Sequence, residues 1–207
     1  MKVINNKLVL SYLAKIRDKN TSCKDFRTYI KKLSGFVIYE ACEFLTCKKI
    51  QVNTPLMPCE CEEIAEDIVI VPILRAALGM SDIALDLLEN ASVGFLGIQR
   101  NESTLEPEFF FEKFPQNVDK KTAIIIDPMF ATGGSAIAAV NKLKSYGVKK
   151  IIFASIIATP IAAQRMKQAH PDVHLITACM DEGLNEYGYI IPGLGDAGDR
   201  IFNTIKK

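Results

Sequence analysis

The chain has 207 residues, of which 49% are hydrophobic and 24% charged, with a formal net charge of +1 at pH 7. This length and composition favour one compact globular domain over a disordered or low-complexity chain. Because positive and negative charges nearly balance, no broad field attracts a polyanion, and nucleic acid is not expected as a partner. The longest apolar runs, such as residues 151–157, fall short of the ~18 to 20 residues that cross a bilayer, so no membrane association is expected.

The N-terminal sequence and the cysteines predict a cytoplasmic protein with reduced thiols. The first residues, MKVINNKLVLSYLAKIRDK, carry charges among the apolar positions and no small-residue cleavage pattern, unlike a signal peptide. Without a secretion signal, the six cysteines are expected to stay unpaired. Cys59 and Cys61 are the only close pair in the sequence. One intervening residue is not a usual zinc spacing, so no zinc site is expected at these cysteines.

Residues 1–47 predict a helical N-terminal arm. Ser22 can cap a helix over residues 22–46, in which apolar residues recur every three or four positions. A shorter amphipathic segment over residues 8–16 precedes it. Because two helices enclose too little apolar surface for a core of their own, these residues are expected to form an arm rather than a domain.

From Ile68 onward, short runs rich in Ile and Val alternate with helical patterns. The runs are IVIVPIL, VGFLGI, TAIIID, IIFASIIA and HLITACM, and they are typical of strands buried on both faces. Helical patterns cover residues 78–89, 135–146 and 161–169. This alternation predicts an α/β fold with an open, mainly parallel sheet flanked by helices.

The segment over residues 101–116, NESTLEPEFFFEKFPQ, breaks this alternation with charges, prolines and three consecutive phenylalanines. It is too long for an ordinary loop and predicts a hairpin arm or a lid. Ligands of open α/β folds bind beyond the carboxyl ends of the strands. We therefore expect functional residues in the loops that follow the strands.

The loop after the strand TAIIID has the properties of a phosphate site. Gly133 and Gly134 lack the Cβ atoms that would block close backbone approach. Thr132 and Ser135 offer hydroxyls beside the free amides of a helix N-terminus, which suit a phosphate. Asp127, at the strand end, is suited to accept hydrogen bonds from sugar hydroxyls. A carboxylate next to an amide cradle therefore indicates a phosphosugar.

Other interpretations of the glycine-rich loops remain. An ordinary strand, turn and helix would also use glycines for tight turning. A P-loop kinase is disfavoured, because Gly134 stands where that motif has lysine. Near the C-terminus, Gly193, Gly195 and Gly198 match a dinucleotide fingerprint, but only nine residues follow, too few for the helix and strand that it opens. This turn could instead bind a flat polar ring through its backbone, or be a surface loop.

Several stretches of the sequence resemble the uracil phosphoribosyltransferase family: VPILRAALGM, QRNESTLEP, DPMFATGGS, HPDV, DEGLNEYGYIIPGLGDAGDR and IF. The similarity runs nearly end to end, so it implies a single domain over residues 1–207 with the type I phosphoribosyltransferase fold. The implied reaction transfers the phosphoribosyl group of 5-phospho-α-D-ribose 1-diphosphate (PRPP) to uracil, giving UMP and diphosphate in pyrimidine salvage. YIIPGLGDAGD resembles the uracil enzymes in particular, within a base-binding segment over residues 185–200.

The resemblance also implies which residues bind each substrate. It assigns PRPP to Arg75, Arg100, Asp127, Pro128, Met129, Phe130, Ala131, Thr132, Gly133, Gly134, Ser135 and Asp196. It assigns uracil to Ile190, Gly195, Asp196 and Ala197. The implied catalytic residues are Arg75, Arg100, Asp127 and Asp196. In this assignment Asp127 holds the ribose hydroxyls, residues 131–135 the 5′-phosphate, and the two arginines the diphosphate.

The chemistry of the implied reaction agrees with these residue types. Breaking the C1 bond builds negative charge on the diphosphate, and fixed cations lower that barrier. Without the resemblance, Arg75 and Arg100 would be interpreted as partners in surface ion pairs. Backbone groups can match the acceptor, donor, acceptor edge of uracil, whereas cytosine would leave buried donors unmatched at ~1 to 3 kcal/mol each. Mg²⁺ is implied as a cofactor, since oxygen ligands and waters suit it. Because it would arrive largely with PRPP, no dedicated metal cage is expected in the chain.

The chain departs from the family in a few places. Gln99 stands where the family often has Tyr, Phe130 stands where Leu is usual, and residues 5–12 and 48–67 match weakly. The resemblance implies a homodimer or higher homo-oligomer, and GTP activates some relatives, although no residue set here decides that. Rival hypotheses are a phosphoribosyltransferase for a purine or orotate, a nucleotide-sensing regulatory protein and a scaffold protein. The C-terminal turn offers no cation for orotate, and a sensor would lack some of the catalytic residues that are present here.

Overall fold

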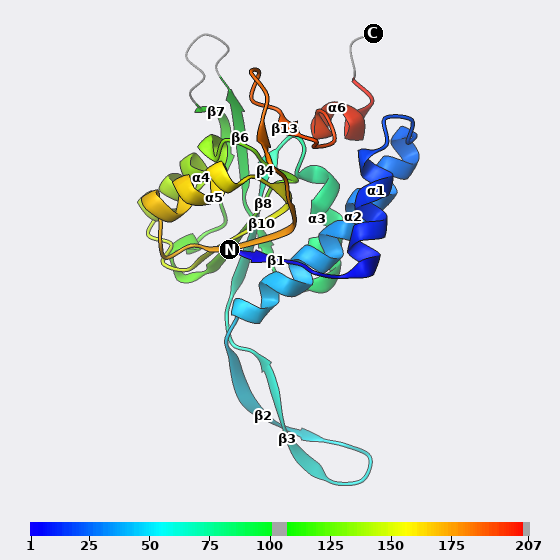
Figure 1. Cartoon of the computed structure of the whole chain (residues 1–207). Helices are drawn as coiled ribbons and strands as arrows, with labels where there is room; N and C mark the ends of the chain where they lie inside the picture. The colour runs from blue at the N-terminus through cyan, green and yellow to red at the C-terminus, as the bar shows by residue number, and fades with distance from the viewer. Residues whose placement is uncertain (101–106, 205–207) are drawn as a thin grey trace.

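The computed structural model describes residues 1–100 and 107–204, which form one large sheet, helices on both of its faces and a long hairpin (Figure 1). The strands of the large sheet are β1 (Lys2–Val3), β4 (Ile68–Leu74), β5 (Ser92–Val93), β6 (Phe95–Arg100), β7 (Pro107–Lys113), β8 (Thr122–Ile126), β9 (Met129–Phe130), β10 (Ile151–Ala158) and β11 (His174–Met180). The other strands are β2 (Cys47–Asn53), β3 (Pro58–Ile64), β12 (Gly183–Leu184) and β13 (Ile190–Ile191). The helices are α1 (Lys7–Arg17), α2 (Cys23–Ala41), α3 (Leu78–Leu87), α4 (Gly134–Ser145), α5 (Pro160–Ala169) and α6 (Ala197–Phe202), with the short 3-10 helices η1 (Cys42–Phe44) and η2 (Val118–Lys120). Within these described ranges, no helix is long and apolar enough to cross a membrane.

The large sheet has the strand order β1-β11-β10-β8-β4-β6-β7, with β5 beside β4 and β9 beside β10. The pairs in this sheet are parallel, except that β7 runs antiparallel to β6. At its centre, Ile70 lies opposite Ile124, and Ile124 lies opposite Ile152. The runs rich in Ile and Val are therefore the central strands, and the prediction of a mainly parallel α/β sheet is confirmed.

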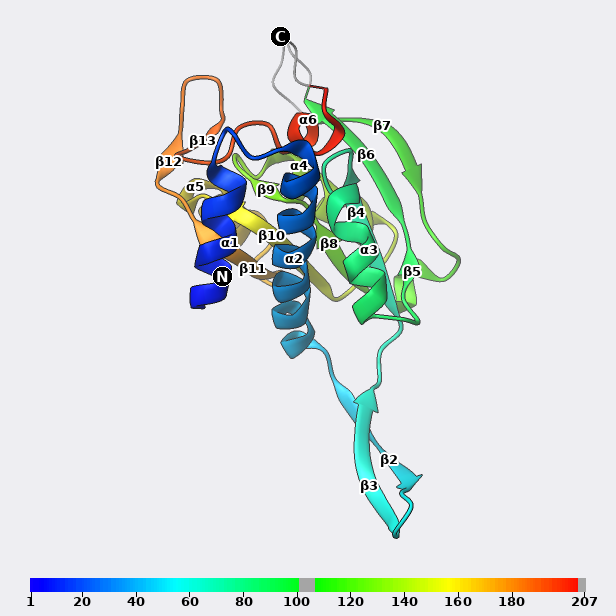
Figure 2. The same ribbon diagram turned by 90° about the vertical axis from the view of Figure 1, so that its right-hand side faces the viewer.

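Helices cover both faces of the sheet and enclose two cores (Figure 2). Along β8, Ile124 and Ile126 face the core beneath α1, α2, α3 and α6, whereas Ala123 and Ile125 face the core beneath α4 and α5. Because both faces are buried, the strand is continuously apolar instead of alternating. The predicted helical patterns correspond to α3, α4 and α5, each within about two residues at its ends.

The N-terminal helices form a layer of the core and not a separate arm. Ser22 caps α2 as predicted, since its Oγ accepts the N–H of Asp25 at 3.1 Å. Helix α2 ends at Ala41, before its predicted end, and a 3-10 turn follows. Phe26 and Ile30 are fully buried, and β1 adds a strand beside β11. The apolar face of α2 therefore completes one side of the sheet.

The segment predicted as a hairpin arm or lid lies partly outside the described residues. Residues 101–106 are not described, whereas residues 107–113 form β7, which pairs with β6. Glu112 of β7 accepts a hydrogen bond from Lys142 of α4 at 2.8 Å, and the same ammonium lies 4.9 Å from the ring centroid of Phe109. The described part is thus held against α4, and closure of a lid stays a prediction.

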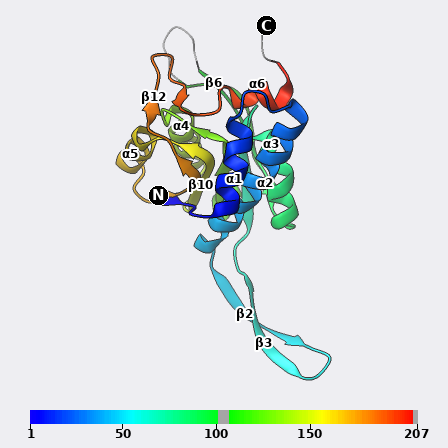
Figure 3. The same cartoon turned by 45° about the vertical axis from the view of Figure 1, so that its right-hand side comes forward.

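A hairpin of β2 and β3, which the sequence did not predict, projects from the body of the molecule (Figures 1 and 3). Its strands pair antiparallel from Cys47 opposite Ile64 to Asn53 opposite Pro58.

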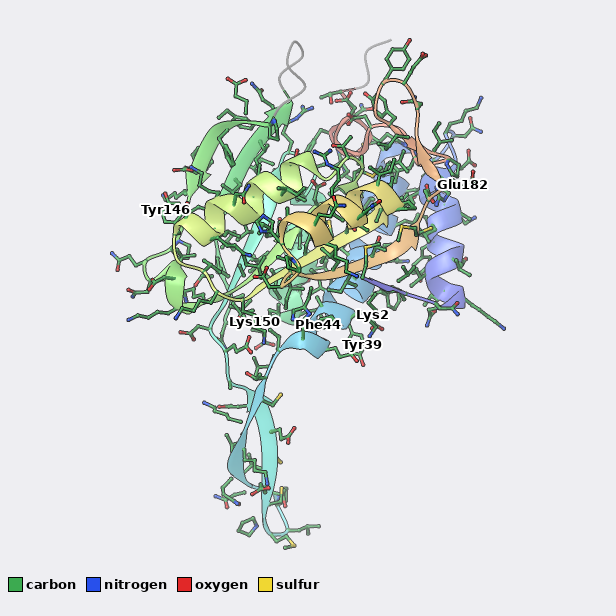
Figure 4. All side chains as sticks on the ribbon, turned by 60° about the vertical axis from the view of Figure 1, so that its left-hand side comes forward. Lys2, Tyr39, Phe44, Tyr146, Lys150 and Glu182 are labelled. Carbon is green, nitrogen blue, oxygen red and sulfur yellow. The ribbon has the colours of Figure 1, made fainter. Side chains whose placement is uncertain are left out.

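Glu66, at the base of this hairpin, accepts hydrogen bonds from Lys150, Thr46 and Thr122, with Nζ of Lys150 at 2.6 Å. Figure 4 shows Lys150 at the end of the body from which the hairpin leaves. Burial would raise the pKa of Glu66, but these donors lower it to about 2.

Candidate active site

The loops that follow the parallel strands gather at one end of the sheet, opposite the β2–β3 hairpin (Figure 1). Strand β4 ends directly before Arg75, β8 before Asp127 and β11 before Asp181. Strands β4 and β8 are neighbours, so the loops that follow them are adjacent. This is the end at which open α/β folds bind their ligands.

The loop from β8 to α4 lines an open cavity of about 70 Å³. Gly133 is the N-cap of α4 and has a left-handed backbone with φ of 82°, a conformation that favours glycine. Because glycine has no side chain to cap the helix, N–H groups of the first turn remain available to a ligand. The hydroxyl of Thr132 accepts the N–H of Gly134 at 3.3 Å and so braces the loop internally. The cavity therefore has the donors and the size of a cradle for one phosphate group.

Most residues predicted for PRPP line this cavity: Asp127, Met129, Phe130, Ala131, Thr132, Gly133, Gly134 and Ser135. Pro128 does not line it; this residue is buried, and its carbonyl accepts the N–H of Ile157 at 3.0 Å. Phe130 is also buried, and its ring centroid lies 4.6 Å from that of Phe153. The side chain of Phe130 therefore packs in the core, so its departure from the usual Leu changes core volume and not the polar groups of the cradle.

Asp127 is half-buried at the wall of the cavity and accepts one described hydrogen bond. Its Oδ1 accepts the N–H of Met129 at 3.1 Å. Burial raises the pKa of Asp127 to about 7, although the hydrogen bond from Met129 opposes that rise. A carboxyl group with this pKa exchanges its proton near neutral pH. Sugar hydroxyls that donate to the ionised form would lower its pKa, so ligand binding and ionisation of Asp127 are expected to be coupled.

Two residues that the sequence analysis did not identify, Thr159 and Arg165, hold backbone carbonyls of the cradle. The hydroxyl of Thr159 donates to the carbonyl of Ala131 at 2.6 Å, and Nη1 of Arg165 donates to the carbonyl of Thr132 at 2.8 Å. The dipeptide of Thr159 and Pro160 is a recognisable helix start, and Thr159 does cap α5. That signal reveals the cap but not the contact with a loop that precedes it by almost thirty residues.

A hydrogen bond joins Arg75, which is predicted to bind PRPP, to the C-terminal helix α6. Nη2 of Arg75 donates to Oδ1 of Asp199 at 3.3 Å, and Asp196, the N-cap of α6, accepts the N–H of Asp199 at 2.7 Å. Because the side chain of Arg75 is 59% exposed, this ion pair is weak and leaves the guanidinium able to turn toward an anion. Arg100 is the last residue of β6, and its side chain lies outside the described part of the structure.

The predicted uracil residues lie at the junction of β13 and α6. Ile190 and Ala197 are buried, whereas Gly195 and Asp196 between them are exposed. A Cβ atom on Gly193 would lie 2.1 Å from the carbonyl oxygen of Ile190, so this turn requires glycine. By contrast, no described atom lies within 4 Å of the Cβ position on Gly195. The turn thus presents bare backbone beside open space, as a site for a flat polar ring requires.

The sheet and the cradle together have the arrangement of the type I phosphoribosyltransferase fold. Among solved structures, the AQ2163 protein from Aquifex aeolicus aligns with a TM-score of 0.89 and 36% identity, covering 97% of this chain and 96% of that chain. A purine phosphoribosyltransferase from Pyrococcus horikoshii aligns with a TM-score of 0.52 and 13% identity, covering 74% of this chain and 83% of that chain. At that identity the likeness concerns the fold alone.

The chain belongs to the uracil phosphoribosyltransferase family, whose model matches residues 3–204. A uracil phosphoribosyltransferase from Campylobacter jejuni is 52% identical and covers 98% of this chain and 97% of its own. Another, from Dictyoglomus thermophilum, is 46% identical and covers 98% of each chain. The family resemblance in the sequence is therefore confirmed over almost the whole chain.

Proposed function

We propose that this protein transfers the phosphoribosyl group of PRPP to uracil and releases UMP and diphosphate. The observation that carries the proposal is the β8–α4 cradle, in which a carboxylate stands next to a helix N-terminus whose N-cap is Gly133, at the carboxyl end of a parallel sheet. Membership of the uracil phosphoribosyltransferase family supports uracil as the acceptor. Incubation of the purified protein with PRPP, Mg²⁺ and uracil should give UMP and diphosphate in equal amounts. No UMP from a folded protein would refute the proposal.

In this proposal PRPP binds to the β8–α4 loop and to the arginines at the ends of β4 and β6. Residues 131–135 bind the 5′-phosphate through backbone N–H groups and hydroxyls, and Asp127 accepts hydrogen bonds from the ribose. Arg75 and Arg100 are assigned to the diphosphate, whose negative charge grows as its bond to C1 breaks and the ribose gains oxocarbenium character. A preorganised cation at that position stabilises the transition state more than the ground state, and the loss of one such group costs roughly 10² to 10³ in rate.

Mg²⁺ is part of the proposal as an ion carried by PRPP. Within the described residues, no group of three or more His, Cys, Asp or Glu side chains could hold a metal ion by itself. The carboxylates near the donor loops, Asp127, Asp196 and Asp199, are hard oxygen ligands of the kind that suits Mg²⁺. When bound, the ion would neutralise part of the charge of the diphosphate. Asp196 is the residue of this chain that we assign to the metal–diphosphate side, either directly or through water.

Uracil is proposed to bind beside the exposed backbone of residues 195–197, with Ile190 next to it. Ala131 of the cradle packs against the same core cluster as Ala197, so the donor and base loops share one support. A rigid backbone turn can match the acceptor, donor, acceptor edge of uracil without ordering a side chain. Cytosine would place an amino group against a backbone N–H, which leaves both donors unmatched. Selectivity for uracil therefore depends on how firmly this turn is held.

We also propose a homo-oligomer in the cytoplasm with GTP as an effector. The β2–β3 hairpin supports the oligomer, because its tip holds the apolar side chains of Leu56 and Met57, which are 94% and 67% exposed in the single chain. A surface of this kind is expected to be covered by protein. Light scattering on the purified chain tests the oligomer. Initial rates with and without GTP, at subsaturating PRPP, test activation.

A further inference from the structure

A partly buried ion pair joins α1 to the loop that follows β11. Arg17, the last residue of α1, donates from Nη1 to Oδ2 of Asp181 at 2.8 Å and from Nη2 to Oδ1 at 2.5 Å. The side chain of Asp181 is only 3% exposed and that of Arg17 is 24% exposed, so the carboxylate is sheltered from water and the guanidinium is partly so. Burial would raise the pKa of Asp181, but the guanidinium and a backbone N–H lower it below its usual value. Asp181 is therefore ionised, and each member of the pair depends on the other.

The same pair holds both polar backbone groups of Gly193. The N–H of Gly193 donates to Oδ2 of Asp181 at 2.8 Å, and its carbonyl accepts from Nη1 of Arg17 at 2.7 Å. The carboxylate of Asp181 thus holds the N–H of Gly193, and the guanidinium of Arg17 holds its carbonyl, which fixes the orientation of this residue. Gly193 precedes Gly195 by two residues and lies within the turn that we assign to the base.

A second arginine, Arg200, joins the same turn to the C-terminal end of α1. Arg200 of α6 donates from Nη1 to the carbonyls of Leu194 and Ile16, at 2.8 Å and 2.5 Å, and from Nη2 to the carbonyl of Asp18 at 2.7 Å. Its guanidinium also lies 4.2 Å from the ring centroid of Phe26. The C-terminal end of α1 lies at the same end of the molecule as α6 and β13 (Figure 2). Two successive carbonyls of the turn are therefore held by two arginines.

We propose that Arg17, Asp181 and Arg200 are positioning residues for the nucleobase: they hold the peptide groups of residues 193 and 194, and so fix the backbone that binds the base at residues 195–197. The inference rests on the proposed function. A turn that contains Gly193 and Gly195 has many accessible conformations, and binding through its backbone is weak unless one conformation is selected beforehand. The ion pair and Arg200 make that selection. The N-terminal helix thereby serves base binding, while the donor cradle is braced separately by Thr159 and Arg165.

The proposal predicts a split between the two substrates. Arg17→Met removes both bonds to Asp181 and the bond to the carbonyl of Gly193, so the KM for uracil should rise by about tenfold or more. The dissociation constant for PRPP, measured without base by calorimetry, should rise much less than the KM for uracil, because the described hydrogen bonds of Arg17 go to Asp181, Gly193 and Cys179 and not to residues 127–135, so that only Asp196 of the donor site lies in the held turn. Arg17→Lys keeps the charge but loses the paired geometry, so it should give an intermediate KM for uracil. Lys15→Met, on an exposed residue of the same helix, should leave both constants unchanged.

Several outcomes would overturn the proposal. An unchanged KM for uracil in Arg17→Met, or an equal loss of affinity for uracil and PRPP, would assign the pair a general structural role. If Arg17→Met does not fold, Arg17→Lys and Arg200→Lys decide the matter by the same split, with thermal melting as the control for folding. If the unmodified protein makes no UMP but binds PRPP, the proposed function fails by itself. If the unmodified protein makes UMP while the variants show no split, only this inference fails.

Discussion

Nη2 of Arg75 lies 3.3 Å from Oδ1 of Asp199, so the loop after β4 touches the helix whose N-cap is Asp196. Arg75 is assigned to the diphosphate of the donor, and residues 195–197 are assigned to the base. Arrival of a diphosphate would compete with Asp199 for the guanidinium. The donor and base sites are therefore joined by a contact that ligand binding is expected to change.

Replacement of Arg75 should impair catalysis without loss of stability. Its ion pair with Asp199 is largely exposed and contributes at most ~1 kcal/mol to the free energy of unfolding. Its proposed contact with the leaving diphosphate contributes more, so Arg75→Ala should lower kcat/KM for PRPP by roughly 10²-fold or more. Steady-state kinetics and thermal melting check this. Lys31→Ala, which removes a similarly exposed ion pair with Asp86, is the control and should change neither quantity.

The protonation of Asp127 should appear in the pH profile. Its pKa of about 7 lies above the usual value of 3.8, so between these values the folded state holds a proton that the unfolded state has released. Stability should therefore fall as pH rises from about 4 to 7, and Asp127→Asn should abolish this part of the profile. If the ionised carboxylate binds the ribose, kcat/KM for PRPP should fall as pH decreases through about 7.

Comparison with Asp127→Asn separates this effect from titration of PRPP itself. The variant should turn over slowly, keep its fold at pH 7 and lack the inflection that belongs to Asp127. A thermal stability lowered in parallel with the activity would instead assign Asp127 a structural role. The same inflection in both proteins would show that the substrate titrates and not the residue.

The turn between β13 and α6 should tolerate a methyl group at one glycine better than at another. A Cβ on Gly193 would lie 2.1 Å from the carbonyl oxygen of Ile190, whereas a Cβ on Gly195 meets no described atom within 4 Å. Both residues have positive φ, which costs about 1 to 2 kcal/mol for alanine. Gly193→Ala should therefore lower the melting temperature more than Gly195→Ala, and should raise the KM for uracil. Equal melting temperatures would contradict the close contact.

Glu66 should stabilise the base of the β2–β3 hairpin at neutral pH. Burial opposes ionisation of Glu66, but Lys150, Thr122 and Thr46 lower its pKa from 4.5 to about 2. The stabilisation is fully present above about pH 4.5 and is lost as pH falls toward 2, with a magnitude on the order of 3 kcal/mol.

Chemical denaturation of Glu66→Gln at pH 7 and pH 3 checks that expectation. The variant should be less stable than the unmodified protein at pH 7, and the difference should shrink at pH 3. Glu63→Gln, which removes an exposed ion pair with Lys48 on the same hairpin, should differ little at either pH. A difference for Glu66→Gln that does not depend on pH would contradict an ionic role.

The parts of the fold that follow from local pattern were predictable. The apolar runs predict the central strands because burial on both faces leaves no polar alternation, and the glycines after Asp127 predict a turn into a helix N-terminus. The β2–β3 hairpin was not predictable, because KKIQVN and CECEEI place charges on both sides of weakly apolar positions. Such strands resemble exposed loops in composition.

Contacts between distant segments could not be predicted from the sequence either. Arg17 and Asp181 are 164 positions apart, and nothing near either residue indicates its partner. Asp181 directly follows the apolar run HLITACM, and this position alone indicates that its carboxylate needs a cation. The identity of that cation, and the role of the pair in holding Gly193, follow only from the packing of α1 against the C-terminal turn.

The central claim is that the cradle holds PRPP and the C-terminal turn selects uracil. The most direct measurement is nucleotide formation with PRPP and Mg²⁺ when uracil, cytosine, orotate and hypoxanthine are offered separately. The account predicts UMP from uracil and no nucleotide from the other three bases. Nucleotide from another base would contradict the assignment of the turn, and bound PRPP with no product from any base would contradict the proposed activity itself.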